Sequence, residues 1–270
     1  MSLKSSDKQR LVEKYGQWAV VTGASSGIGK AFAEHLAEAN FNIVLTARRL
    51  NLLQELAADL QSRYGIETKI VEGDLTDDKT IENLLRETEN LNVGLAVMNA
   101  GFGTSGDFLR SNLDNELEML DLNCRTLFVL THHFGKRFAD KRRGGIILLS
   151  SIVAFQGVPF AAHYAATKAY VQTLGEAISI EVEPFGVDIL VAAPGPVKSG
   201  FGERAGMDLG KAIDPKTIIP EILRALGKKS IVFPGMWTKF LTWTLRIVPR
   251  PGKIRIMKQV MGGMTKHQRN

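Results

Sequence analysis

Short apolar runs alternate along most of the chain with longer segments of helical periodicity. Such runs, without regular polar alternation, are typical of strands in a parallel sheet that helices cover on both faces. The predicted strands are Trp18–Thr22, Asn42–Ala47, Thr68–Val71, Leu95–Met98, Gly145–Leu149, Val187–Ala192 and Ser230–Phe233. The main predicted helices cover residues 28–39, 50–63, 77–90, 113–140 and 163–183. This alternation predicts an α/β fold with a single-domain, doubly wound parallel sheet.

The chain after the sixth predicted strand is less regular. Residues 195–212 are rich in Gly and Pro and predict a mobile loop. Residues 236–249 are apolar and aromatic, and Pro249 and Pro251 end this segment. Because no repeat or linker divides the chain, we predict one domain over 1–270, in which 236–270 form a basic helical extension.

Composition agrees with this interpretation. The 270 residues include 44% apolar and 23% charged residues, which is typical of a soluble globular chain. A lone cysteine, Cys124, excludes an internal disulfide and a multi-cysteine metal site, so we expect no metal and a cytoplasmic location. We find no cleavable signal at the N-terminus and no uncharged apolar run long enough to span a bilayer.

The net charge of +6 is unevenly distributed. Every acidic residue lies at or before Glu221, whereas residues 222–270 contain 11 Lys and Arg residues and no acid. The basic character therefore belongs to the C-terminal segment, and we do not predict nucleic-acid binding from it.

A glycine-rich loop joins the first predicted strand to the first helix. In this loop Gly23 permits a tight turn, Gly27 clears space for a pyrophosphate and Gly29 lets helix and strand pack closely. The helix N-terminus offers amide donors to an anion. A glycine-rich loop can also be only a turn, but its strand–loop–helix context favours a dinucleotide site in a Rossmann-type fold.

The end of the second strand indicates which dinucleotide is bound. An NAD site usually has an acidic residue there, whereas this sequence has Ala47, Arg48 and Arg49. Arg48 can bind a 2′-phosphate with two hydrogen bonds, so we predict NADP(H). The other interpretation is a solvated arginine pair at a helix start, where the helix dipole disfavours cations.

Candidate catalytic residues lie near the fifth strand and the helix after it. Tyr164 and Lys168 are four residues apart and therefore share one helix face. We expect the ammonium group of Lys168 to lower the pKa of the Tyr164 phenol. Ser151 ends the fifth strand at the carboxyl edge of the sheet, where its hydroxyl can hold a carbonyl oxygen.

Over about residues 12–200 the sequence resembles the short-chain dehydrogenase/reductase family. The residues that match its catalytic tetrad in order and spacing are Asn123, Ser151, Tyr164 and Lys168. The matching cofactor-binding segments contain Gly23, Ser25, Ser26, Gly27, Ile28, Gly29, Asp74, Leu75, Asn99, Ala100, Gly101, Pro194, Gly195, Val197 and Ser199. Ser199 departs from the usual Thr. The placement of Arg48 resembles the NADP-preferring subgroup, and residues 14–23 resemble membrane-associated 3-oxoacyl-thioester and hydroxysteroid reductases.

This resemblance implies hydride transfer between NADP(H) and a carbonyl or alcohol substrate, with a lipophilic substrate expected. It implies that Tyr164 is the general acid or base and that Lys168 lowers its pKa and binds the ribose. It also implies that Ser151 stabilises the oxyanion and that Asn123 holds a proton-relaying water. A homodimer or homotetramer is expected. The alternative is a catalytically silent NADP-binding sensor or scaffold, which would be expected to lose the tetrad.

The C-terminal segment permits two interpretations. Trp237, Phe240, Leu241, Thr244 and Val248 follow helical spacing beside cations that no acid neutralises. Aromatic anchors with cations are typical of an anionic membrane interface, which predicts peripheral membrane contact through 236–270. The same helix could instead cover the substrate pocket or a subunit interface, and for this family we favour that interpretation.

Overall fold

The structure is a computed structural model that describes residues 2–210 and 212–268. One sheet of seven parallel strands forms its centre, in the order β3-β2-β1-β4-β5-β6-β7. The strands are β1 (Trp18–Thr22), β2 (Asn42–Ala47), β3 (Thr68–Glu72), β4 (Val93–Met98), β5 (Gly144–Leu149), β6 (Val187–Ala192) and β7 (Ile231–Val232). This order confirms the doubly wound parallel sheet, because the chain crosses over beside β1 and then builds outward in the other direction.

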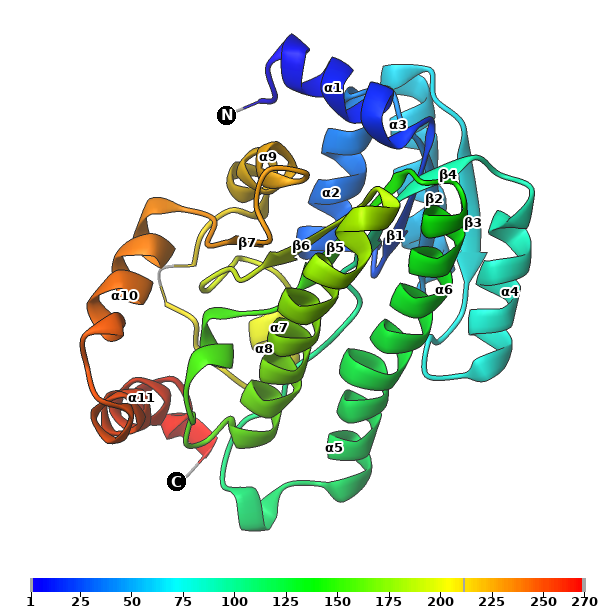
Figure 1. The fold of residues 1–270 in the computed structure, drawn as a ribbon. Coiled ribbons are helices and arrows are strands. Elements are labelled where there is room, and N and C mark those ends of the chain that lie inside the picture. Colours follow the sequence, from blue (N-terminus) through cyan, green and yellow to red (C-terminus); the bar gives the residue numbers. More distant parts are fainter. Residues whose placement is uncertain (1, 211, 269–270) are drawn as a thin grey trace.

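Helices cover both faces of the sheet (Figure 1). They are α1 (Ser5–Tyr15), α2 (Gly27–Glu38), α3 (Leu50–Tyr64), α4 (Asp78–Glu89), α5 (Leu113–Leu120), α6 (Leu127–Asp140), α7 (Ala162–Val182), α8 (Phe201–Arg204), α9 (Pro215–Ala225), α10 (Met236–Arg246) and α11 (Arg250–Met264). Successive strand residues point to opposite faces. Ala19 and Val21 therefore join the core beneath α1, α2, α3 and α9, whereas Val20 joins the core beneath α4, α6 and α7.

The predicted strands are all present, although β7 has only two residues. The predicted helix 113–140 is interrupted by a π-helical turn, η2 (Asp121–Thr126), between α5 and α6. The sequence analysis did not predict α1 or α9. In α1 only Leu11 and Tyr15 are buried, which gives a weak apolar period, and α9 contains Pro220, a residue that normally ends a helix.

The C-terminal extension consists of two helices, α10 and α11, which lie together on the side of the molecule opposite α4 (Figure 1). Pro249 ends the first segment as predicted, but Pro251 stands in the first turn of α11, where its missing N–H costs no hydrogen bond. Among residues 2–210 and 212–268, no helix is long and apolar enough to cross a membrane.

Candidate active site

A large cavity opens at the carboxyl ends of the central strands, with a volume of about 1260 Å³. Its polar half is lined by the loop from β1 to α2 and by the ends of β2, β4 and β5. Its apolar half is lined by the loop after β6 and by α10 and α11. The cavity therefore joins the predicted dinucleotide site to a compartment built from the C-terminal extension.

The glycine-rich loop has the backbone shape that was predicted, with one difference. Gly23 has a positive φ of 67°, and a Cβ on Gly29 would lie 2.2 Å from the carbonyl oxygen of Gly23. Helix α2 can therefore pack this closely on the loop only without a side chain at Gly29. Gly27 also has a positive φ, but a Cβ there would contact the side chain of Ser199 at 2.7 Å. A side chain at Gly27 would therefore collide first with Ser199, in the loop after β6. The sequence had predicted that Gly27 clears space for a pyrophosphate.

Thr22 fixes the loop after β1 to the loop after β4. Its hydroxyl accepts hydrogen bonds from the backbone N–H groups of Asn99 and Ala100, both at 2.9 Å, and donates one to the carbonyl of Val97. The Asn99 amide nitrogen in turn donates to the carbonyls of Thr22 and Gly23. Thr22 was predicted as the last residue of the first strand and was not assigned to the site.

Two arginines stand at the end of β2 and line the cavity. Arg48 forms ion pairs with Asp74 at 3.2 Å and with Glu118 at 3.4 Å. Arg49 donates hydrogen bonds of 2.9 Å to the hydroxyls of Ser25 and Ser26. The sequence analysis chose only Arg48, yet Arg49 is the arginine that contacts the glycine-rich loop. The adjacent pair in the sequence was the signal that could have identified it.

Asp74 and Leu75 lie beside this arginine pair. Partial burial acts to raise the pKa of Asp74, but hydrogen bonds from Thr76 and the Arg48 cation outweigh it and hold that pKa below its ordinary value. Asp74 is therefore a stable anion. Leu75 is buried, and its carbonyl accepts a 2.6 Å hydrogen bond from Thr126.

Ser151, Tyr164 and Lys168 meet where the polar and apolar halves of the cavity join. Ser151 lies two residues after the end of β5, and α7 presents Tyr164 and Lys168 on one face, one turn apart, as predicted. The Lys168 Nζ lies 5.9 Å from the centre of the Tyr164 ring and donates a 2.9 Å hydrogen bond to the carbonyl of Leu149. All three side chains are buried.

The expected lowering of the Tyr164 pKa by Lys168 is not found in this structure. Burial raises the pKa of Tyr164 to about 12, although the nearby Ser151 hydroxyl acts to lower it. Burial also lowers the pKa of Lys168 to about 8. For Tyr164 the cost of burying the phenolate outweighs the effect of the Ser151 hydroxyl, so Tyr164 is protonated at neutral pH.

The side chain of Asn123 makes three hydrogen bonds, to Phe102 and Thr167. Asn123 lies in the π-helical turn and is buried. Its amide nitrogen donates to the carbonyl of Phe102 at 2.8 Å and to the hydroxyl of Thr167 at 3.0 Å, and its oxygen accepts from the Phe102 N–H at 3.1 Å. These contacts join the loop after β4 to α7, so the side chain fixes that loop. The predicted role of Asn123 in holding a water stays a prediction.

The pKa of Lys168 leads to a prediction about stability. Between about pH 8 and its ordinary pKa of 10.5 the unfolded chain binds more protons than the folded chain, so the free energy of unfolding rises with pH. Lys168→Met removes this titration. We expect the free energy of unfolding of the wild type to rise by up to roughly 3 kcal/mol relative to that of Lys168→Met across this window. Urea unfolding at several pH values measures the difference. Tyr164→Phe keeps Lys168 and removes a group that titrates higher, so the difference in unfolding free energy between the wild type and this variant should not rise in the same window. A pH-independent difference would contradict the assignment.

The segment after β6 contains Pro194, Gly195, Val197 and Ser199, and all four line the cavity. The carbonyl of Pro194 accepts a hydrogen bond from Ile152, next to Ser151. The N–H of Gly195 donates to the hydroxyl of Thr238 in α10 at 3.3 Å. The C-terminal extension is therefore hydrogen-bonded directly to one of the predicted cofactor-binding segments.

Residues of α10 and α11 form the apolar wall of the cavity. Four of the five residues in the predicted aromatic stripe face it: Trp237, Leu241, Thr244 and Val248. Only Phe240 points away. The favoured interpretation of that stripe, a cover over the substrate pocket, thus agrees with the structure for these four residues.

Glu118 and Arg204 are two further polar residues near the site that the sequence analysis did not select. Arg204 pairs with Glu118 at 2.9 Å and lies 3.6 Å above the ring of Phe102. Since Glu118 also pairs with Arg48, one carboxylate connects the arginine at the end of β2 with the loop after β6. No sequence pattern shows this link, because it depends on the packing of α5 against both segments.

Comparison with known proteins gives concordant results. A family model described as short chain dehydrogenase matches residues 17–209. The chain is 31% identical over 236 residues to a 7beta-hydroxysteroid dehydrogenase of Collinsella aerofaciens, covering 85% of this chain and 90% of that protein. It is 33% identical over 231 residues to a very-long-chain 3-oxoacyl-CoA reductase of Neurospora crassa, covering 83% and 69%.

Solved structures agree. A 7beta-hydroxysteroid dehydrogenase structure superposes with a TM-score of 0.84 at 29% identity, covering 92% of this chain and 98% of that chain. A short-chain dehydrogenase of Sphingobium yanoikuyae in complex with NADPH superposes with a TM-score of 0.77 at 26% identity, covering 84% and 92%.

Proposed function

This chain belongs to the short-chain dehydrogenase family, and we propose that it is an NADP(H)-dependent reductase of lipophilic carbonyl compounds. The proposal rests chiefly on one observation. Ser151, Tyr164 and Lys168 lie at the junction between a glycine-lined polar compartment and an apolar compartment of the same cavity. This is the position where a donor of hydride and a carbonyl carbon can meet.

The residues of the polar compartment fit a dinucleotide phosphate. The turn at Gly23 and the close packing at Gly29 hold the N-terminus of α2 at the cavity, where its backbone N–H groups can bind phosphate oxygens. Arg48 and Arg49 supply two guanidinium groups at the end of β2, where a 2′-phosphate is recognised. When bound, NADPH supplies a hydride to the substrate carbon.

We assign the proton chemistry to Tyr164. Because its pKa is about 12, Tyr164 keeps its proton at neutral pH and can donate it to the developing alkoxide. Ser151 donates a hydrogen bond to the same oxygen. Lys168 holds ribose hydroxyls and adds positive charge close to the phenol, and Asn123 positions the loop after β4. The roles of Tyr164 and Ser151, and the ribose contact of Lys168, are those that the resemblance implies, whereas the loop-positioning role of Asn123 comes from its hydrogen bonds in this structure.

The substrate class is inferred from the apolar compartment. Leu241, Leu245, Met257 and Met261 line it, so it offers hydrocarbon contacts to a bulky substrate. The relatives named above include a hydroxysteroid dehydrogenase and a very-long-chain 3-oxoacyl-CoA reductase, and both names describe lipophilic substrates. We therefore propose a steroid-like ketone or a long-chain 3-oxoacyl thioester.

An NADPH-oxidation assay tests this proposal. The panel contains a small water-soluble ketone, a steroid ketone and 3-oxoacyl thioesters of increasing chain length. We expect turnover to be detectable on the lipophilic compounds and KM to fall as the apolar part grows. Tight NADPH binding without oxidation on any of them would instead support a sensor or scaffold.

Cofactor preference gives a second prediction. Arg48→Ala should weaken NADPH binding by about 10- to 100-fold, because a charge-assisted bidentate contact contributes roughly 1.5–3 kcal/mol. NADH affinity should change little, since NADH has no 2′-phosphate. Fluorescence titration of both cofactors measures these affinities. Arg86→Ala, which removes an exposed arginine of α4, is the control. Equal losses for NADPH and NADH would show that Arg48 acts on folding or on the adenine.

We further propose that the protein is a homodimer or homotetramer. Large apolar side chains remain exposed on α5 and α6, among them Leu113, Leu117 and Phe128. Exposed apolar faces on adjacent helices are typical of a subunit interface. Sedimentation velocity of Leu117→Arg against the wild type measures the oligomeric state.

A further inference from the structure

The outer face of α10 is apolar although nothing in the described structure covers it. Met236, Phe240, Trp243 and Ile247 follow one another at intervals of four, three and four residues, which places them on one side of the helix. Their side chains are 51% to 86% exposed. None of the four lines the cavity, whose wall is formed by the opposite side of α10.

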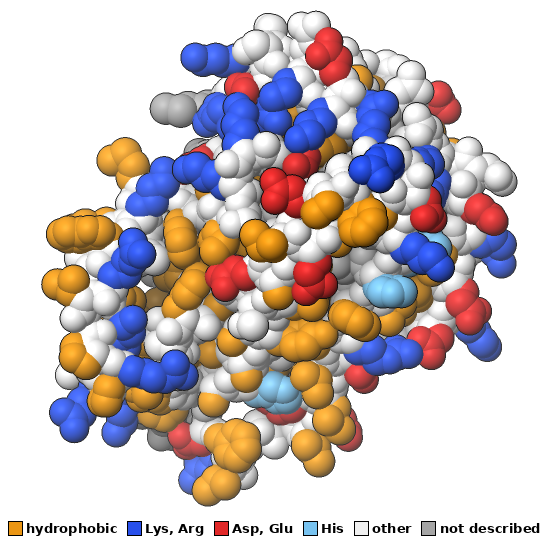
Figure 2. Space-filling view, in the orientation of Figure 1, with side chains coloured by type: hydrophobic (Ala, Val, Ile, Leu, Met, Phe, Trp, Pro, Cys, Tyr) orange, Lys and Arg blue, Asp and Glu red, His pale blue; other side chains and the backbone are white. Residues whose placement is uncertain are grey.

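Cations surround this apolar stripe. Arg246 and Arg250 lie at the end of α10 and the start of α11, and Lys253, Arg255 and Lys258 continue along α11. Within residues 2–210 and 212–268 none of these five forms an ion pair, and the chain contains no acid after Glu221. Figure 2 shows the result, with hydrophobic and basic side chains interspersed along the left edge of the molecule over α10 and α11.

We propose that this surface, the outer faces of α10 and α11, binds an anionic lipid bilayer. Trp and Phe side chains insert at the level of the lipid headgroups, and Lys and Arg on the same surface attract anionic lipids. A second copy of this chain fits less well. A twofold contact through this surface would bring its uncompensated cations against the same cations of the partner.

The position of the surface connects it to the cavity. Helix α10 presents Phe240 and Trp243 outward and Leu241 and Leu245 toward the cavity, so a single helix separates the bilayer from the apolar compartment. A lipophilic substrate could then enter from the membrane without crossing water. This consequence rests on the proposed function, whereas bilayer binding does not.

Cosedimentation of the full chain with vesicles tests the proposal. We use phosphatidylcholine vesicles with and without phosphatidylglycerol, at low and high salt and without cofactor. The wild type should bind the anionic vesicles more strongly, and salt should weaken this binding. Arg250→Gln with Arg255→Gln should reduce the affinity at low salt by about 25-fold, since each cation contributes about 1 kcal/mol.

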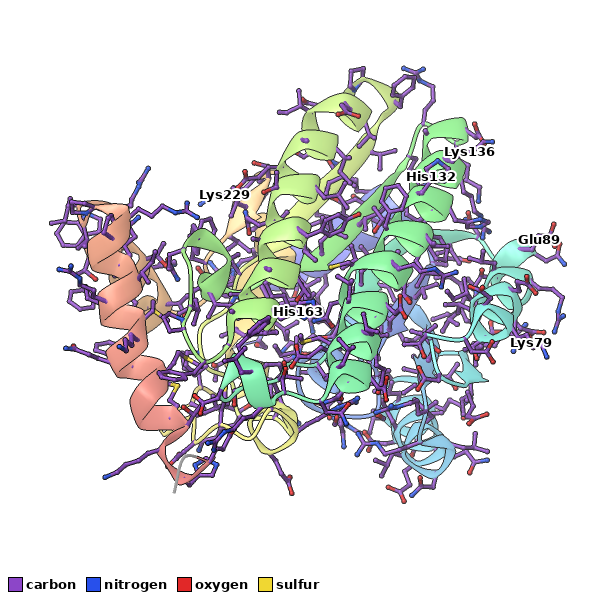
Figure 3. All side chains as sticks on the ribbon, turned by 90° about the horizontal axis from the view of Figure 1, so that it is seen from below. Lys79, Glu89, His132, Lys136, His163 and Lys229 are labelled. Carbon is purple, nitrogen blue, oxygen red and sulfur yellow. The ribbon has the colours of Figure 1, made fainter. Side chains whose placement is uncertain are left out.

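Two variants provide controls for charge and for depth. Lys79→Gln with Lys136→Gln removes the same charge from the opposite side of the molecule (Figure 3) and should bind like the wild type. Bromine-labelled lipid should quench the fluorescence of the wild type, and Trp243→Phe should lose part of that quenching while still binding, because Trp237, which is 57% exposed and stacks on Phe240, remains. The quenching of the wild type still tests bilayer contact if the double arginine variant fails to fold.

Several outcomes would overturn the proposal. They are no binding to either kind of vesicle, or equal binding to neutral and anionic vesicles. A third is a loss of vesicle affinity in the Lys79→Gln, Lys136→Gln control as large as that in the Arg250→Gln, Arg255→Gln variant. A change in the sedimentation coefficient of the Arg250→Gln, Arg255→Gln variant without any vesicle binding would assign the surface to a second copy instead. Because no arm depends on NADPH oxidation, these results are independent of whether the enzymatic proposal holds.

Discussion

Replacing Tyr164 by Phe is expected to reduce turnover by about 10²- to 10⁴-fold, the contribution typical of a positioned general acid. The ring volume is kept, and the ring contact with Phe201 at 5.1 Å between centroids should survive, so the cavity should keep its shape. NADPH affinity should therefore stay close to that of the wild type. Steady-state kinetics on the best ketone, together with NADPH titration, measures both quantities.

A Tyr170→Phe variant is the matched control. It removes a half-exposed phenol that lies less than two turns after Tyr164 on the same helix and does not line the cavity. It should retain near wild-type turnover. If Tyr164→Phe kept more than a few per cent of the activity, Tyr164 would not be the proton donor.

Gly29→Ala is expected to lower NADPH affinity by about a hundredfold or more and to destabilise the fold by a few kcal/mol, a loss typical of overpacking. Its Cβ would lie 2.2 Å from the carbonyl oxygen of Gly23 and 2.5 Å from the amide nitrogen of Asn99. Both are parts of the rigid Thr22–Asn99 contact, so α2 itself must move away. The movement displaces the helix N-terminus from the phosphate position. Titration with NADPH and urea unfolding give the two effects.

Gly263→Ala is the control for a glycine within a helix. A Cβ at Gly263 meets nothing within 4 Å, so this variant should keep cofactor affinity and match or slightly exceed the wild-type stability. Unchanged NADPH binding in Gly29→Ala would show that the glycine-rich loop is only a turn.

The strands and the site motifs were predictable because each depends on local sequence. Continuous apolar runs such as Leu95–Met98 correspond to buried strands, and the motif residues lie where those strands end. The shared helix face of Tyr164 and Lys168 follows from their spacing alone. This is why the doubly wound parallel sheet and the position of Ser151 at its carboxyl edge were predicted.

Properties that depend on burial or on distant packing were not predictable. The pKa of Tyr164 is set by desolvation, which no spacing rule reports. The π-helical turn at Asn123 is stabilised by contacts to Phe102 and Thr167, far away in the sequence. For α10 the sequence indicated one apolar stripe, whereas the structure has two, one facing the cavity and one facing outward. Only the placement of the helix on the cavity separates them.

Transfer of deuterium tests the central claim most directly. NADPH that carries deuterium at both C4 positions of the nicotinamide is incubated with the protein and a lipophilic ketone, and the product is analysed by mass spectrometry. We predict one deuterium at the carbinol carbon of the alcohol, and about a hundredfold less of this product, or still less, from Tyr164→Phe within the same time. Saturating NADPH binding with no deuterated alcohol from any ketone or 3-oxoacyl thioester would contradict the assignment of this site as a carbonyl reductase.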